Sequence, residues 1–501
     1  MWKTILELTN IEAKEFFLKE DSYFTFDLPK YFSFKKILEK VDKKISWKDL
    51  KTFFKSADTP NNYEDVNYKI FHNKNWKYTR RCLELINPAI YVSLVNEITK
   101  EENRDTIKKA FKKLKRWSLI ICKSMPIKPK ESSNNRRTQI KNRWEEVEQE
   151  SISLSLEYNY LLKTDIVDCY WSIYTHSIVR ALHTKEISKK NKQDESLIWN
   201  IIDKHIQYMS NWQTNWIPQW SILMDFIAEM VLWYIDSEIT KKIREESINS
   251  EDFKIIRYRD DYRIFVNDSS MWEKIIKILT MVLSDIGMRT NQEKTSFSDD
   301  IILNSIKEEK LYLMQTYKYN KNIQKELLNM LIFSRKYKNS KQLNKYLQNL
   351  FYRIEKRNKT HQNINVIIGI LIDLAYNNPE SYPIITIILG KFLSFIPKKN
   401  EKIKILKKIS NKFSKIPNTE HFDIRLQRIY LCCNIKNEYR WNLCKKVLDN
   451  SINLWSTKRL NKNLKTIIDT ASIIDKKEIE NLEKTKDMEE VKRLGKKNEH
   501  Y

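Results

Sequence analysis

The chain has 501 residues, and its 91 lysines and arginines against 65 aspartates and glutamates give a formal net charge of +26 at pH 7. A length of about three usual domains excludes a small disulfide-stapled protein. The positive surplus favours polyanionic partners, with nucleic acid or nucleotides first among them. Apolar residues make up 41% of the chain, which excludes wholesale disorder.

The six cysteines form no CxxC pair and have no zinc-like spacing with histidine. We therefore expect reduced thiols in a reducing compartment and no structural metal. Charges interrupt the N-terminal sequence within a few positions, and residues 377–380 separate the two longest apolar stretches, 364–376 and 383–396. The sequence predicts no membrane span and a cytoplasmic location.

Residues 1–160 are basic and mostly helical in pattern, and the polar stretch 128–143 predicts an exposed loop. The pattern changes over residues 161–304. Strands are expected at 160–167, 253–258, 262–266 and near 289–297, with helices at 175–186, 196–210, 221–240 and 271–286. The two middle strands read as a hairpin. This order predicts an α+β domain with helices on one face of an antiparallel sheet.

Residues 305–475 have helical patterns with short polar connections, and residues 476–501 form a charged tail. Stacked helical hairpins of a HEAT-like solenoid and an irregular helical domain both fit this pattern. The sequence contains no clean repeat that would decide between them. Helices are expected near 322–336, 340–357, 364–377, 381–396, 401–414, 422–434, 438–452 and 462–473.

Three carboxylates stand where a rigid site is expected. Asp165 lies in the predicted strand 160–167, and Asp260 and Asp261 lie at the tip of the predicted hairpin. Strand ends and hairpin tips suit a site that holds two cations about 4 Å apart. Such a site favours phosphoryl transfer, although an Asp-Asp pair alone also occurs as a turn cap.

Four segments resemble, in order, motifs A to D of reverse transcriptases: LLKTDIVDCYWSIYTHSIVRALH, QTNWIPQWSILMDFIAEMVLWYID, IIRYRDDYRIFV and MRTNQEKTSF. The YxDD form at residues 258–261 is the most specific of them. WEEVEQ at 144–149 and NPAIYVSLVNEI at 87–98 are similar to the bacterial reverse transcriptases of phage defence, including the abortive-infection group. The resemblance covers about residues 60–300. It implies a right-hand polymerase palm and fingers, followed by an all-α domain in place of a thumb.

The resemblance also implies roles for the motif residues. Asp165, Asp260 and Asp261 would be catalytic and would bind two Mg²⁺ ions, with Mn²⁺ as a substitute. Tyr170 would exclude a ribose hydroxyl and so select deoxynucleotides. Gln219 would line the incoming nucleotide.

Three basic residues are further candidates for nucleotide binding. Lys294 would neutralise or protonate the departing pyrophosphate, and a solvated lysine is the alternative. Arg80 and Arg81 would contact the triphosphate from the fingers, because a guanidinium matches phosphate oxygens. A place on a helix surface is their alternative. Asp168 and Asp225 are expected to bond locally, as a turn cap and in the first turn of a helix.

The implied activity is that of a DNA polymerase, RNA-directed or template-independent, which adds dNMPs to a 3′ hydroxyl in antiphage defence. Its partners would be dNTPs and RNA or DNA, and a homo-oligomer is compatible with the family. Some relatives prime from a protein tyrosine, which makes Tyr23, Tyr31 and Tyr63 candidates for covalent DNA attachment against a plain packing role. The alternative from another class is an inactive palm that serves as an RNA-binding scaffold. A cyclic-dinucleotide synthase is disfavoured because the sequence has no GGDEF-like turn.

The chain departs from the family in its tryptophans. It has 14 tryptophans and only 4 glycines, and six tryptophans stand where a small residue is expected: Trp171, Trp199, Trp212, Trp216, Trp220 and Trp233. Glycine serves positions where the backbone approaches a ligand or adopts positive φ. Either the indoles line the template groove, which favours untemplated synthesis or an inactive relic, or TGA codons for glycine have been read as tryptophan.

Overall fold

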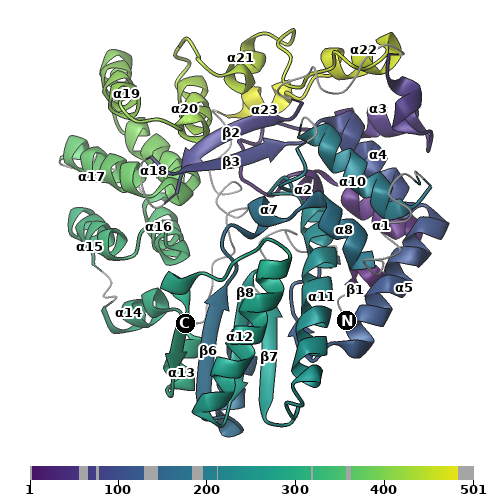
Figure 1. The fold of residues 1–501 in the computed structure, drawn as a ribbon. Coiled ribbons are helices and arrows are strands. Elements are labelled where there is room, and N and C mark those ends of the chain that lie inside the picture. The colour runs from purple at the N-terminus through teal and green to yellow at the C-terminus, as the bar shows by residue number, and fades with distance from the viewer. Residues whose placement is uncertain are drawn as a thin grey trace.

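The computed structural model describes residues 3–55, 66–74, 78–128, 145–182, 194, 196–210, 213–316, 320–356 and 363–482. Most of the predicted basic loop, Tyr63, Trp212 and the first residue of WEEVEQ lie outside these ranges. Figure 1 shows a sheet with flanking helices, a long hairpin above the sheet, and a stack of helices along one side.

The sheet is built from short strands with alternating faces. Its order is β4-β7-β8-β6-β9, with β4 at Ile120–Cys122, β6 at Tyr160–Asp165, β7 at Phe253–Tyr258, β8 at Asp261–Val266 and β9 at Ser296–Ser298. Along β7, Ile255 packs in the large core cluster, whereas Ile256 packs in a smaller cluster on the opposite face. This is the period of two that a strand imposes on its side chains. Both faces are therefore covered.

Helices α11 (Ile222–Glu245) and α12 (Ser269–Asp285) pack against this sheet (Figure 1). Between β6 and α11 the chain forms α7 (Cys169–Ser172), α8 (Thr175–Leu182) and α10 (Ile198–Met209). These elements agree with the predicted order of strand, helices, hairpin, helix and strand. The sheet is mixed, however, because β4 pairs parallel to β7, with Ile120 opposite Ile255. The prediction of an antiparallel sheet is wrong at this edge, since three residues are too few to show a strand pattern.

The region expected to be mostly helical also contains strands. β2 (Tyr68–Asn73) and β3 (Arg80–Leu85) form an antiparallel hairpin, and β1 (Lys3–Thr4) pairs with β5 (Ile127–Lys128). The helices around them are α1 (Asn10–Phe17), α2 (Glu20–Tyr23), α3 (Lys35–Ile45), α4 (Pro88–Thr99) and α5 (Glu101–Trp117). α4 begins at a strong signal, because the Asn87 side chain accepts a hydrogen bond from the Ala89 N–H and Pro88 occupies the first turn.

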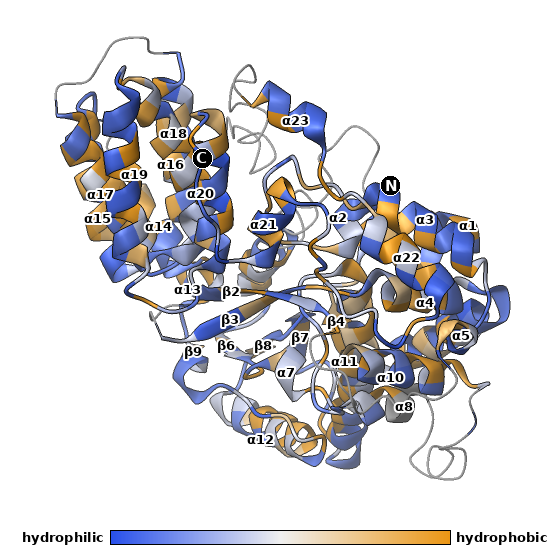
Figure 2. Cartoon of the chain, turned by 90° about the horizontal axis from the view of Figure 1, so that it is seen from above, coloured by the Kyte–Doolittle hydropathy of each residue, from blue (hydrophilic) through white to orange (hydrophobic). Residues whose placement is uncertain are grey.

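The chain beyond the sheet is helical. Its helices are α13 (Ile301–Ser305), α14 (Glu308–Thr316), α15 (Ile323–Lys336), α16 (Lys341–Ile354), α17 (Ile364–Asn377), α18 (Tyr382–Ser394), α19 (Lys399–Phe413), α20 (Glu420–Cys432), α21 (Asn442–Leu448), α22 (Lys462–Thr470) and α23 (Lys476–Asn481). A second apolar cluster runs through this region from Ile323 to Ile435. Figure 2 shows these helices striped with apolar and hydrophilic residues, as amphipathic helices are.

The C-terminal part of the chain returns to the N-terminal part. The Asn461 N–H donates to the Phe53 carbonyl at 2.7 Å, and the Ser33 N–H donates to the Ile473 carbonyl at 2.8 Å. Leu460 and Leu464 accordingly pack in the same core cluster as the N-terminal helices.

The β2–β3 hairpin is tied to the helical stack. Arg81 forms an ion pair with Glu380, and the Tyr68 hydroxyl donates to Glu420. The Asn73 side chain donates to the Pro417 carbonyl at 2.9 Å. None of the six cysteines, all of which lie in the described ranges, forms a disulfide. None of the described helices is both long and apolar enough to cross a membrane.

Candidate active site

The strand register brings the three predicted carboxylates to one end of the sheet. β6 pairs with β8 so that Asp165 is directly opposite Asp261. The next pair is joined by a hydrogen bond from the Ile166 N–H to the Asp260 carbonyl at 3.1 Å. In an antiparallel ladder this makes Asp165 and Asp261 a non-hydrogen-bonded pair, whose side chains lie on one face and close together.

The three side chains affect one another electrostatically. Partial burial, followed by repulsion from Asp260, raises the pKa of Asp261 to about 6. Burial also raises the pKa of Asp260, and the charge of Asp165 adds to the effect. Both shifts record negative charge crowded into a site of restricted hydration.

Lys294 supplies a positive charge in direct contact with Asp165. It follows α12 in a short 3₁₀ turn, and its ammonium forms an ion pair with Asp165 Oδ2. Burial works against its charge, but the contact with Asp165 outweighs burial and raises the pKa of Lys294. Its side chain is 68% exposed, whereas that of Asp165 is 7% exposed. The ammonium therefore lies at the mouth of the site.

The carboxylates fit a divalent cation by their chemistry. Mg²⁺ prefers oxygen ligands and is usually held by one or two carboxylates together with substrate phosphates. Asp165 Oδ1 is buried and has no hydrogen-bond partner, which leaves an acceptor for a cation. Among the residues that the structure describes, no three His, Cys, Asp or Glu side chains are grouped closely enough to hold an ion as they stand. The Lys294 ammonium meets Asp165 on its other oxygen.

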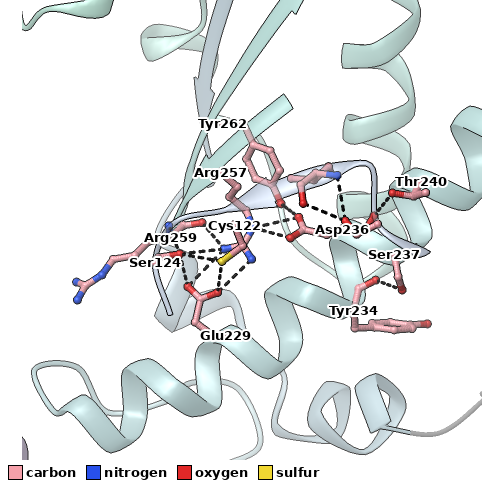
Figure 3. A network of polar contacts seen from close by, with 12 residues as sticks. Cys122, Ser124, Glu229, Tyr234, Asp236, Ser237, Thr240, Arg257, Arg259 and Tyr262 are labelled. Atoms are coloured by element: carbon pink, nitrogen blue, oxygen red, sulfur yellow. Dashed lines mark hydrogen bonds and ion pairs between the residues drawn. The ribbon is translucent and has the colours of Figure 1, made fainter. Parts of the chain in front are cut away.

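A buried charge network holds the hairpin tip that carries Asp260 (Figure 3). Arg257 has no exposed side-chain surface, and its Nε donates to both carboxylate oxygens of Asp236, at 3.0 and 2.8 Å. Its Nη2 donates to Glu229 at 3.1 Å, and its Nη1 donates to the Arg259 carbonyl at 3.0 Å. The Arg259 N–H donates to Ser124 Oγ at 2.8 Å. Both backbone polar groups of Arg259, at the hairpin tip, are therefore hydrogen-bonded.

The sequence analysis did not predict this network, although the network leaves a signal in the sequence. Glu229 and Asp236 are seven residues apart on α11, which places two acids on one face of a helix whose other residues there are mostly apolar. Arg257 is a charge within a buried strand. Charges in such positions are retained only when they are paired.

Asp225 does not bond locally as predicted. It lies in the first turn of α11, but its Oδ1 accepts a hydrogen bond from the Tyr170 hydroxyl at 2.6 Å and its Oδ2 pairs with Arg259 at 2.7 Å. The prediction is wrong because the fold brings motif A and the hairpin tip to this helix end. Gln219 is partly exposed and lies in the short segment between Ile217 and α11. The Ile217 N–H donates to the Tyr170 carbonyl at 3.0 Å.

The two arginines predicted to contact the triphosphate, Arg80 and Arg81, lie on β3, so a place on a helix surface is wrong for both. Arg80 is exposed, with its guanidinium 4.7 Å from the centre of the Phe71 ring. Arg81 is engaged by Glu380. Asp168 makes no cap bond with its side chain and instead pairs with Lys74 at 3.2 Å, which joins the segment after β2 to the start of α7.

Among those of the six tryptophans that the structure describes, Trp220 alone has a backbone conformation typical of glycine. Its φ is 73°, in the left-handed region that bulky residues rarely adopt, and its indole N–H is buried without a partner. Trp47, which the sequence did not single out, has φ 67°. Trp171 and Trp216 stack with ring centres 5.1 Å apart, while Trp199 and Trp233 lie inside the helices α10 and α11.

The structure contradicts a priming role for two of the three tyrosine candidates. Tyr23 and Tyr31 have no exposed surface. The Tyr23 hydroxyl donates to the Ile86 carbonyl, and the Tyr31 hydroxyl donates to Gln427 at 3.3 Å. The folded chain keeps both hydroxyls away from nucleotides, so they are packing tyrosines. Tyr63 lies outside the described residues.

Residues 90–320, a little under half of the chain, match the reverse transcriptase (RNA-dependent DNA polymerase) family. No curated protein matches the sequence. Among solved structures, the chain is similar to apo telomerase from Candida tropicalis, with 13% identity and a TM-score of 0.33 over 88% of this chain and 75% of that one. It is also similar to telomerase from Candida albicans in complex with a fragment of telomeric RNA, with 13% identity and a TM-score of 0.32 over 74% and 68% of the two chains.

The family match spans the five-stranded sheet, in which Asp165 ends β6, Asp261 begins β8 and Asp260 lies in the turn between β7 and β8. The chain therefore contains a reverse transcriptase domain at residues 90–320. It is an enzyme of the RNA-directed DNA polymerase class, a nucleotidyltransferase.

Proposed function

We propose that this chain adds dNMPs to a 3′ hydroxyl by phosphoryl transfer, with Asp165, Asp260 and Asp261 as the catalytic carboxylates. One observation carries the proposal: the register of β6 against β8 sets Asp165 opposite Asp261 and bonds the next residue to Asp260. Residues almost a hundred positions apart in the sequence meet at one sheet end. A turn cap would require no such meeting.

Each residue has a task that its surroundings support. Asp165, Asp260 and Asp261 would hold two Mg²⁺ ions, or Mn²⁺ in their place. When bound, these ions supply a lower pKa for the attacking hydroxyl and stabilise the charge of the leaving pyrophosphate. Lys294 keeps its proton, because its pKa is raised, and its exposed ammonium can donate that proton to the pyrophosphate.

The nucleotide would lie between the carboxylates and the fingers. The Tyr170 ring supports discrimination against ribose, and the partly exposed Gln219 lies in the segment whose backbone bonds to Tyr170. Arg80 is exposed on β3 and is available to a triphosphate. Arg81 would have to exchange Glu380 for phosphate, so we assign the fingers contact to Arg80 first.

Incorporation of labelled dNTPs by the purified chain tests this function. The wild type is expected to extend a primer or itself in Mg²⁺ and to lose activity with EDTA. Asp260→Asn is expected to lower incorporation by at least about 10³-fold, because it removes a ligand charge without changing side-chain volume. Asp285→Asn, an exposed position at the end of α12, is the matched control. Equal signals from wild type and Asp260→Asn would contradict the proposal and favour the RNA-binding scaffold.

The same assay addresses the template and the product. Incorporation that depends on added RNA indicates RNA-directed synthesis, and incorporation without RNA indicates untemplated synthesis. Nuclease and protease digestion of the labelled product shows whether the DNA is attached to the protein. Tyr63 is the remaining candidate for such attachment.

A role in antiphage defence in the cytoplasm is the physiological part of the proposal. The likeness of NPAIYVSLVNEI and of the motifs to the phage-defence reverse transcriptases supports it. NPAIYVSLVNEI forms α4, whose residues are all buried, with Asn87 as its cap. The test is phage plating on cells that express the wild type or Asp260→Asn. Protection by the wild type alone supports the role, and equal plating on both contradicts it.

A further inference from the structure

We propose that Asp225 is a positioning residue for sugar selection, which holds the Tyr170 ring in place and ties that ring to the hairpin tip through Arg259. The inference rests on the proposed function, since it concerns the nucleotide site of the same polymerase. It adds a residue outside the catalytic carboxylates. The ligand class is the sugar of a nucleoside triphosphate.

The contact with Tyr170 is a strong one. The Tyr170 hydroxyl donates to Asp225 Oδ1 at 2.6 Å, and a hydrogen bond to a charged acceptor is stronger than one between neutral groups. Burial, together with the neighbouring charge of Asp225, raises the pKa of Tyr170 well above its ordinary value. The hydroxyl therefore stays protonated and remains a donor.

The other oxygen of Asp225 reaches the hairpin tip. Arg259 Nη2 contacts Asp225 Oδ2 at 2.7 Å, and the Asp225 side chain is only 9% exposed. Arg259 has φ 56°, a left-handed conformation that the bonds to Ser124 and Arg257 support. Arg259 immediately precedes Asp260 in the chain. Asp225 thus joins the aromatic ring, the helix α11 and the catalytic hairpin.

Such a connection matters because steric selection depends on the position of the ring. Repulsion between a ring and a hydroxyl changes steeply over a fraction of an ångström, so a ring that is free to shift selects poorly. Tyr170 has a second constraint at its backbone, whose carbonyl accepts from the Ile217 N–H. The backbone bond fixes the main chain of Tyr170, and the bond to Asp225 fixes the hydroxyl end of its ring.

The test compares dNTP and rNTP incorporation, as the ratio of kcat/KM values for the same base. The variants are Tyr170→Phe, which keeps the ring and removes the bond, Asp225→Leu, which removes the acceptor, and their double variant. Asp285→Asn is the control. We expect each single variant to lower the dNTP preference about tenfold. The double variant is expected to lose no more than Asp225→Leu alone, because Tyr170→Phe removes a bond that Asp225→Leu has already removed.

The outcomes distinguish a failure of this inference from a failure of the proposed polymerase function. If the wild type incorporates neither nucleotide, the proposed function fails. If the wild type is active and Tyr170→Phe keeps the wild-type dNTP preference, the positioning role is overturned while the polymerase stands. Circular dichroism checks the fold of Asp225→Leu. Should that variant not fold, the ratio for Tyr170→Phe decides the matter alone.

Discussion

Replacing Arg257 with methionine would leave two buried carboxylates without their cation. The side chains of Glu229 and Asp236 are 2% and 3% exposed, and that of Arg257 is fully buried between them. Breaking a buried ion pair by removing one partner costs about 3–5 kcal/mol. The buried methionine would also leave the Arg259 carbonyl without its donor.

The matched comparison neutralises the whole cluster. In the triple variant Arg257→Met, Glu229→Gln and Asp236→Asn, the amides can still accept hydrogen bonds from Ser124 and Tyr262, which bond these acids at 2.6 and 3.0 Å. No uncompensated charge remains buried. We expect the triple variant to lie within about 2 kcal/mol of the wild type, since removing all charges of a buried cluster is often nearly neutral.

Hydrogen exchange resolved to peptides of β7 and β8 is the assay, because it reports the opening free energy of this sheet in a chain of several cooperative units. For Arg257→Met the expected loss corresponds to amide exchange faster by a factor of about 10² to several thousand. The triple variant should recover most of the protection. If the triple variant exchanges as fast as the single one, uncompensated buried charge is not the cause of the destabilisation, and the reasoning is refuted.

Three further predictions concern other parts of the molecule. Burial raises the pKa of Glu84 to about 7, so the stability that its protonated form contributes is fully present below pH 4.5 and is lost as the pH rises through 7. The Glu84→Gln variant keeps an uncharged side chain, so its stability relative to the wild type should increase by about 3 kcal/mol between pH 4.5 and pH 8. Hydrogen exchange of β3 measures this difference. Trp220→Gly should raise the melting temperature, because it removes left-handed strain of about 1–2 kcal/mol and a buried N–H without a hydrogen-bond partner. Trp199→Gly, inside α10, should lower it. TGG codons at positions 216 and 220 would contradict the hypothesis that these tryptophans are mistranslated glycines. Lys294→Met should lower kcat about 10²-fold in single-turnover incorporation while unfolding is unchanged, and unaltered kcat would refute its role as proton donor.

The order of elements around the site could be predicted from the sequence because it depends on local patterns. The alternation in β7 and β8 and the helical spacing in α11 and α12 are properties of short windows. The chain positions of Asp165, Asp260 and Asp261 followed from the same windows and from four ordered motifs. The helices α15 to α20 were found within a few residues for the same reason.

Only the tertiary structure decided which of these residues meet. The register of β6 against β8 sets Asp165 opposite Asp261, and a shift by one residue would turn one of them to the other face. The partners of Asp225, 55 residues back at Tyr170 and 34 ahead at Arg259, were beyond any local pattern, as were the parallel strand β4 and the pairing of Arg81 with Glu380. Hydrophobic periodicity indicates which face of each segment packs against the core, but it carries no information on which polar groups pair between segments that are distant in the sequence.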